Sequence, residues 1–153
     1  MPRADAPIGV FDSGIGGLSV LRALRAALPH DDFVYFADSA HAPYGERDDA
    51  HVQARSRAVL AELQAAHGIK AFVIACNTAT AAAAEALRAA HPDQVIVGIE
   101  PALKPALTLT RTGRIGVLAT RGTLASPKFR VLHHGLATRA EFVLQPCDGL
   151  ANA

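Results

Sequence analysis

The sequence has neither an excess of one charge nor a long apolar run. Its 15 Lys and Arg residues nearly cancel its 14 Asp and Glu residues, and it carries no charged low-complexity tail. This balance argues against an intrinsically disordered chain and against a protein that binds nucleic acid by electrostatic attraction. No apolar run approaches the roughly 20 residues needed to cross a bilayer, and the first residues lack the apolar stretch of a signal peptide. We therefore expect a cytoplasmic protein with no membrane partner and no nucleic-acid partner.

Cysteine is scarce, because Cys76 and Cys147 are the only two in the 153 residues. Two cysteines cannot form a disulfide framework, and in a reducing compartment they are expected to be free thiols. Among the seven histidines, His133 and His134 are adjacent, so on a helix they point in different directions and make a poor metal pair. We expect no metal site.

The sequence does contain an alternation of short β-branched or aromatic runs with longer segments rich in alanine and leucine. This alternation is typical of βα units, so it predicts an α/β fold around a parallel sheet. The expected strands are Ile8–Phe11, Phe33–Ala37, Ala71–Ala75, Val95–Ile99, Arg114–Ala119 and Glu141–Gln145. Each run is nearly continuous in apolar character, which predicts strands that are covered on both faces.

Helical spacing between these runs predicts three helices, at Leu18–Leu28, Asp48–His67 and Thr78–Ala90. Two further helices are expected, one near Pro101 and Pro105 and one that starts at Ser126-Pro127, a pairing that suits a helix start. We expect the chain to divide near residue 100, with a first α/β lobe at residues 1–99 and the start of a second lobe at residues 100–153.

Small and ionisable residues follow the first three predicted strands, in the segments Asp12–Gly17, Asp38–Gly45 and Cys76–Thr80. Because ligands of an open parallel sheet bind beyond the carboxyl ends of its strands, these segments predict a ligand site. A phosphate on the glycine-rich turn is disfavoured, because a dinucleotide motif would need glycine at Ser19 and because Asp12 would repel a pyrophosphate. Asp12 and Ser13 suit a ligand with an ammonium group better.

Cys76 is the most informative residue of these segments. It lies at the predicted start of a helix, where the pKa of a thiol can fall, so we expect the thiolate to be favoured. Asp12, at a neighbouring strand end, is expected to orient or deprotonate the thiol. The alternative is a buried cysteine that acts as a small apolar residue. A Cys-His hydrolase would need an imidazole near the Cys76 thiol, and among the histidines His41 alone lies in a predicted strand-end loop. Cys147 is expected to be inert.

Three blocks of sequence carry a resemblance to a known family. They are Gly9–Gly17, Ala42–Gly45 and Ala75–Ala79, with support from Gly98–Pro101 and Gly116–Thr120. Together they resemble glutamate racemase, in the cofactor-independent aspartate/glutamate racemase family, from about Pro7 to Leu150. The resemblance implies two similar α/β lobes with the site between them. It also implies interconversion of L- and D-glutamate by thiol acid/base proton transfer, which supplies D-glutamate for peptidoglycan. No lysine lies in the three blocks to form a pyridoxal Schiff base.

The resemblance also assigns roles to seven residues of this sequence. Cys76 would be one of two acid/base thiols. Asp12 and Ser13 would contact the substrate and set the protonation state of that thiol. Tyr44 and Gly45 would bind the side-chain carboxylate of the substrate, and Asn77 and Thr78 would hold the substrate beside Cys76. The expected partner is therefore a small-molecule substrate, glutamate.

The sequence departs from the family in one respect. The family's second thiol lies in a Cys-Thr-His block downstream of position 153, and Cys147 does not match that block. Racemisation needs one group on each face of the α-carbon, so the resemblance implies a truncated racemase that is inactive alone. Two alternatives stay open, namely a racemase for aspartate or another small amino acid, and a fragment that binds an amino acid without turning it over. A homo-oligomer also stays open.

Overall fold

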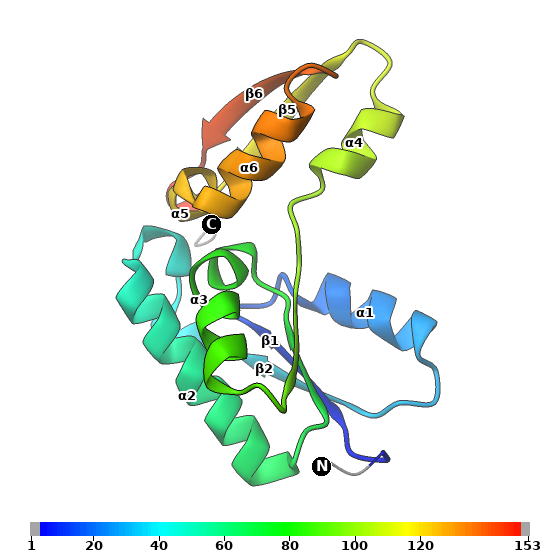
Figure 1. Ribbon diagram of the computed structural model, residues 1–153, viewed down its shortest axis with the longest axis vertical. Helices are drawn as coiled ribbons and strands as arrows, with labels where there is room; N and C mark the ends of the chain where they lie inside the picture. Colours follow the sequence, from blue (N-terminus) through cyan, green and yellow to red (C-terminus); the bar gives the residue numbers. More distant parts are fainter. Residues whose placement is uncertain (1–3, 151–153) are drawn as a thin grey trace.

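A computed structural model describes residues 4–150 as two parallel sheets with helices packed on them (Figure 1). The first sheet has the strand order β2-β1-β3-β4 and the second pairs β5 with β6. The strands are β1 (Ile8–Asp12), β2 (Phe33–Ala37), β3 (Ala71–Ile74), β4 (Val95–Gly98), β5 (Arg114–Ala119) and β6 (Glu141–Pro146). The outer ends of the two expected lobes, residues 1–3 and 151–153, lie outside the described residues.

The first sheet is covered on both faces. Helices α2 (Asp49–His67) and α3 (Asn77–Ala90) pack on one face, where Phe11 and Phe72 stack within the main core. Helix α1 (Leu18–Ala27) packs on the other face, over Val10 and Val73. The alternation of side chains along β1 and β3 sends successive residues to these two layers. The core of this part therefore covers both faces of β1 and β3, and the site is expected at the carboxyl ends of these strands.

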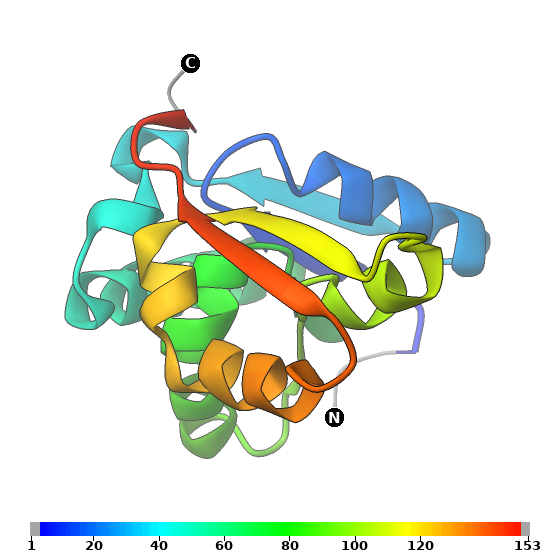
Figure 2. The same cartoon turned by 90° about the horizontal axis from the view of Figure 1, so that it is seen from above.

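The second sheet is covered on one face only. Helices α4 (Leu103–Leu109) and α6 (Pro127–Leu136) bury Ile115 and Val117 of β5, and the short helix α5 (Arg121–Ala125) follows β5 directly. Figure 2 shows β5 and β6 lying above these helices. On the open face, Leu118 is 68% exposed and Val143 is 50% exposed. The burial of alternate residues along β5 is the pattern of a half-covered strand.

The α/β fold predicted from the sequence is confirmed, and each predicted strand agrees with the structure to within one residue. The expectation that every strand is covered on both faces is wrong for β4, β5 and β6. Strand β4 is an edge strand in which Val95 is 58% exposed, and β5–β6 has helices on one side only. The division of the chain into two lobes near residue 100 stays a prediction. No helix within residues 4–150 is long and apolar enough to cross a membrane.

The glycine-rich turn after β1 is a tight connection into α1. The Asp12 carboxylate accepts a hydrogen bond of 2.9 Å from the Gly17 N–H, at the residue that caps α1. A methyl group added at Gly17 would lie 2.7 Å from the Asp12 Cβ and 2.9 Å from the Tyr35 hydroxyl. Glycine is therefore required at this position by close approach of the backbone to its neighbours.

The packing at Gly17 predicts that Gly17→Ala destabilises the protein by about 1–3 kcal/mol, because the methyl group displaces packed atoms in the turn. Gly14→Ala is the matched control in the same turn, since a methyl group there has no neighbour within 4 Å. Urea unfolding followed by circular dichroism measures both free energies. Equal unfolding midpoints for the two variants would contradict the packing argument.

Candidate functional site

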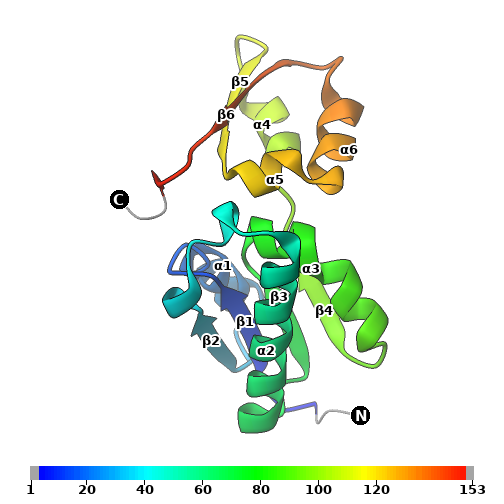
Figure 3. The ribbon, with the colours of Figure 1, turned by 90° about the vertical axis from the view of Figure 1, so that its left-hand side faces the viewer.

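A cavity of about 850 Å³ lies between the two sheets, on the side where β1, β3 and β5 end. Figure 3 shows the junction, with α5 and β5 on one side and the ends of the first sheet on the other. All seven residues that the sequence assigns to the site line this cavity: Asp12, Ser13, Tyr44, Gly45, Cys76, Asn77 and Thr78. They come from three separate segments that follow β1, β2 and β3. The seven residues predicted from the sequence are thus brought to one place by the fold, and their roles stay predictions.

Cys76 joins β3 to α3 and is 8% exposed. Its backbone is extended, and its sulfur accepts a hydrogen bond from the Ala79 N–H at 3.4 Å, so Cys76 is the N-cap of α3. The Ser13 hydroxyl lies 3.8 Å from the same sulfur. The thiol thus lies between the turn after β1 and the first turn of α3, with one wall of the cavity around it.

The expected lowering of the Cys76 pKa by the helix start is wrong. Burial raises the pKa of the Cys76 thiol above its ordinary value, and the negative charge of Asp12 raises it further. Hydrogen bonds from Ala79 and Ser13 act in the opposite direction but do not compensate for burial. A thiolate loses more solvation in this position than the helix start returns, so the neutral thiol is favoured at Cys76.

Asp12 is the carboxylate whose charge acts on the Cys76 thiol. It ends β1, is 7% exposed, and accepts the Gly17 N–H. Its charge also acts on Tyr35, whose pKa is raised to about 12 by burial, by Asp12 and by Cys76. A cavity wall with a buried carboxylate beside a neutral thiol attracts a cationic group of a ligand.

Three threonine hydroxyls of the cavity lining meet where the start of α3 contacts the start of α5. Thr78 Oγ1 lies 2.9 Å from Thr120 Oγ1 and 3.3 Å from Thr123 Oγ1, and the Thr120 and Thr123 hydroxyls are 3.0 Å apart. Thr120 and Thr123 line the cavity but were not identified from the sequence. The sequence did offer one signal, because a threonine directly after a predicted strand is typical of a helix N-cap. In the structure Thr120 is such an N-cap, and its hydroxyl accepts a hydrogen bond from the Thr123 N–H.

Tyr44 lines the cavity, but its hydroxyl is hydrogen-bonded elsewhere. The side chain is 1% exposed, and its hydroxyl donates a hydrogen bond of 2.5 Å to Asp38 rather than facing the cavity. Gly45 lies directly against the second sheet, because a methyl group there would be 2.4 Å from the Thr120 Cβ. The η2 turn (Tyr44–Glu46) therefore presents backbone to the cavity at this point.

The remaining candidates lie away from the thiol. His41 pairs with Asp38 at 2.9 Å, and among the described residues no histidine lines the cavity, which counts against the Cys-His hydrolase. Cys147 follows β6, and its thiol donates to the Gln145 carbonyl. No group of three or more His, Cys, Asp or Glu residues within the described part of the chain could hold a metal ion.

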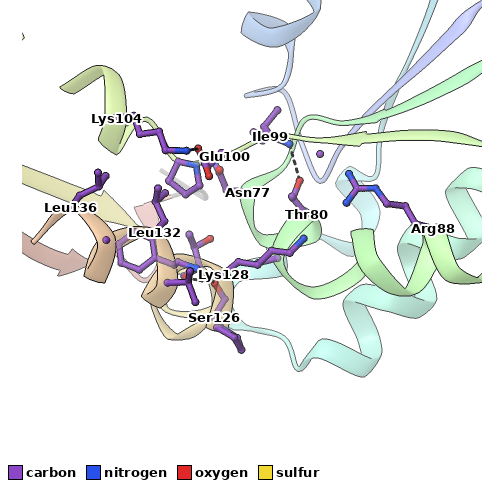
Figure 4. Close-up of a pocket in the computed structure, with 18 residues that line it drawn as sticks. Asn77, Thr80, Arg88, Ile99, Glu100, Lys104, Ser126, Lys128, Leu132 and Leu136 are labelled. Atoms are coloured by element: carbon purple, nitrogen blue, oxygen red, sulfur yellow. Dashed lines mark hydrogen bonds and ion pairs between the residues drawn. The ribbon is translucent and has the colours of Figure 1, made fainter. Parts of the chain in front are cut away.

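A second cavity of about 740 Å³ adjoins the first, between α3, the end of β4 and α6 (Figure 4). The two cavities share Asn77, Ile99, Pro101 and Thr123 as lining residues. Its charged groups are Arg88, Glu100, Lys104 and Lys128, of which Glu100 and Lys104 form an ion pair at 2.9 Å. Its apolar wall comes from α6.

Comparison with known proteins gives a consistent result. The family model described as Asp/Glu/Hydantoin racemase matches residues 9–148. The glutamate racemase of Ectopseudomonas mendocina is 52% identical over 150 residues, which are 98% of this chain and 57% of that protein. The chain thus spans little more than half the length of such relatives.

Solved structures agree with the sequence comparison. The Escherichia coli glutamate racemase, solved with L-glutamate and the activator UDP-MurNAc-ala, is 35% identical with a TM-score of 0.87 over 96% of this chain and 55% of that chain. A Bacillus anthracis glutamate racemase isoform is 35% identical with a TM-score of 0.81 over 98% of this chain and 56% of that chain. The α/β fold of the chain therefore matches about half of each of these structures.

The raised pKa of Cys76 predicts slow alkylation near neutral pH. Because burial and Asp12 both disfavour the thiolate, the rate should keep rising above about pH 8.5, where that of an ordinary thiol levels off. The measurement is the rate of reaction with iodoacetamide against pH in a Cys147→Ser background, with a short cysteine peptide as reference.

Asp12→Asn is the informative variant of this experiment. It removes the negative charge but keeps an oxygen that accepts the Gly17 N–H, so the midpoint should move to lower pH. A midpoint at or below that of the peptide in the parent chain would overturn the description of the site as a buried neutral thiol.

Proposed function

The chain belongs to the Asp/Glu/hydantoin racemase family, and from this premise we propose that it carries a glutamate-binding half-site of a glutamate racemase. The half-site consists of Cys76 and the groups that surround it in the cavity. The observation that carries the proposal is the buried thiol in the cavity wall with Asp12 and Ser13 beside it and polar groups from Asn77 and Thr78 next to it. In bacterial cells the family role is to supply D-glutamate for peptidoglycan, in the cytoplasm.

Each charged group of glutamate has a candidate partner in the half-site. The Asp12 carboxylate and the Ser13 hydroxyl suit the ammonium group, and the Asn77 and Thr78 side chains offer donors to the α-carboxylate. The Tyr44 hydroxyl is committed to Asp38, so the side-chain carboxylate is assigned to the backbone of Tyr44 and Gly45. Thr120 and Thr123 add hydroxyls from the second sheet.

The proposed chemistry is proton transfer at the α-carbon. One cysteine, as the thiolate, takes the α-proton, and the electron pair of the broken C–H bond passes into the α-carboxylate. An acid on the opposite face then returns a proton to the carbon. Without an electron-sink cofactor, the site must lower the barrier by on the order of 10 kcal/mol through preorganised hydrogen bonds and exclusion of water.

The charge state of Cys76 fits one half of this reaction. A thiol that burial keeps neutral is suited to donate its proton to the carbanion, in the direction where Cys76 acts as the acid. When a substrate ammonium group lies beside Asp12, the charge of that carboxylate is balanced and its effect on the thiol falls. The ammonium group thereby offsets the effect of Asp12 on the Cys76 pKa, while burial, the larger cause, remains.

Among the described residues, Cys76 is the one cysteine that lines the cavity, and Cys147 is not among the residues lining that cavity. Because inversion needs a group on each face of the α-carbon, we infer that these 153 residues bind glutamate without racemising it. The segment between β4 and α4 is then the connection between two lobes that together form the substrate site. The alternatives are a preference for aspartate or another small amino acid, or a binding role without catalysis.

Glutamate binding predicts protection of Cys76 from alkylation. Saturating D- or L-glutamate should slow the reaction of Cys76 with iodoacetamide about tenfold, because the ligand covers the thiol. Cys147 lies outside the cavity in the same chain and should react at an unchanged rate. Peptide mass spectrometry reports both residues in one sample. Protection by aspartate at lower concentration than by glutamate would favour the aspartate alternative, and absence of protection by either would overturn the half-site.

The one-thiol inference predicts no inversion of configuration. Incubation of each glutamate enantiomer with the purified chain in heavy water, followed by proton NMR and chiral chromatography, should show no formation of the opposite enantiomer. Measurable racemisation that is lost in Cys76→Ala would show that the chain supplies both acid/base groups, and would contradict this inference while supporting the family assignment.

A further inference from the structure

Asp38 is the most heavily hydrogen-bonded side chain near the cavity. It follows β2, is 4% exposed, and receives donors at both carboxylate oxygens. Arg55 of α2 binds it through two nitrogens, at 2.9 Å and 3.0 Å, and His41 lies 2.9 Å from one oxygen. The Tyr44 hydroxyl donates to the other oxygen at 2.5 Å. Such a two-nitrogen contact fixes geometry as well as charge.

These hydrogen bonds stabilise the charged form of the Asp38 carboxylate. Burial alone would raise the pKa of Asp38, but hydrogen bonds from Arg55, Tyr44 and His41 outweigh burial and lower it to about 2. Burial first, and then the hydrogen bond to Asp38 and its negative charge, raise the pKa of Tyr44 above its ordinary range, although Arg55 acts in the opposite direction. The pair of Asp38 and Arg55 therefore keeps its charges, and Tyr44 keeps its proton, over the whole physiological range.

The other side of the η2 turn presses against the second sheet. Gly45 has no room for a methyl group beside Thr120, and the Gly45 carbonyl lies 3.3 Å from the position a methyl group would take at Gly122. The Glu46 carboxylate accepts the Gly149 N–H at 3.1 Å. The turn is thus held between Asp38 on one side and α5 on the other, and its backbone lines the cavity between them.

Asp38, His41 and Arg55 do not line the cavity, so any effect they have on a ligand passes through Tyr44 and its neighbours. We propose that the Asp38–Arg55 pair is a positioning device that holds the Tyr44–Gly45 backbone at a fixed distance from Cys76 and thereby selects the length of the acidic ligand. This inference rests on the proposed function, because it assigns the side-chain carboxylate to that backbone. The proposal therefore expects aspartate, whose side chain is one methylene shorter than that of glutamate, to gain less from this backbone when its α-carbon is beside Cys76.

The test compares Arg55→Gln with Arg57→Gln. Arg57 is an exposed arginine on the same helix, two residues further on, so its loss changes the charge equally without touching Asp38. The first measurement needs no ligand. Amide hydrogen exchange, read by mass spectrometry, should become faster in the segment of residues 42–46 of Arg55→Gln and stay unchanged in Arg57→Gln.

The second measurement is the concentration of glutamate, and of aspartate, that halves the alkylation rate of Cys76. In Arg55→Gln the value for glutamate should rise about tenfold, as expected for loss of a hydrogen bond to a charged group, while the value for aspartate changes little. The preference for glutamate over aspartate therefore falls about tenfold. Arg55→Lys keeps the charge with a simpler donor and should recover part of that preference.

The outcomes separate the two proposals. If the parent chain is not protected by glutamate, the half-site fails and this inference fails with it, whatever the exchange data show. If the parent is protected but both ligands weaken equally in Arg55→Gln, the pair only stabilises the fold, and the positioning role is wrong. Faster exchange of residues 42–46 with an unchanged preference for glutamate also rejects it.

Discussion

The whole site depends on the burial of one thiol where β3 ends and α3 begins. Cys76 must leave the sheet in an extended conformation and at the same time cap the helix, so its sulfur points toward the carboxyl edge of the sheet. Everything else in the cavity is arranged around this point, with the turn after β1 on one side and the α5 threonines on the other. A thiol with more access to water would keep its ordinary acidity, and the cavity would lose the low-dielectric setting in which charges act strongly.

Two carboxylates at neighbouring strand ends have opposite environments. Asp38 meets the guanidinium of Arg55 and two other donors, so its charge is matched inside the protein. Asp12 has the Gly17 N–H as its hydrogen-bond donor, and its field reaches both Cys76 and Tyr35. One carboxylate therefore serves to fix a turn in place, whereas the other leaves negative potential in the cavity for a ligand to balance.

Local sequence patterns were sufficient for the six strands, for the longer helices and for the edge of the sheet at which residues gather, but they did not predict the short helix α5. Strand lengths followed from apolar runs, and the start of α6 followed from Ser126 before Pro127. Properties that depend on distant parts of the chain were not accessible in this way. The sign of the Cys76 shift depends on how deeply α3 and the β1 turn bury the sulfur, and no local signal gives that depth. The spacing of Thr120 and Thr123 indicated a helix start, but their hydrogen bonds to Thr78, 42 and 45 residues away in sequence, could be found only in the structure.

The half-covered second sheet has a consequence for how the cavity opens. Both strands of a two-stranded sheet are edge strands. The exposed side chains of Leu118 and Val143 contribute little buried apolar surface to the stability of this sheet. This part of the chain therefore has less cooperative support than the layers around β1 and β3, and it is the part in which local fluctuations cost least. Release of α5 from Thr78 would widen the cavity beside Cys76 while the first sheet stays intact.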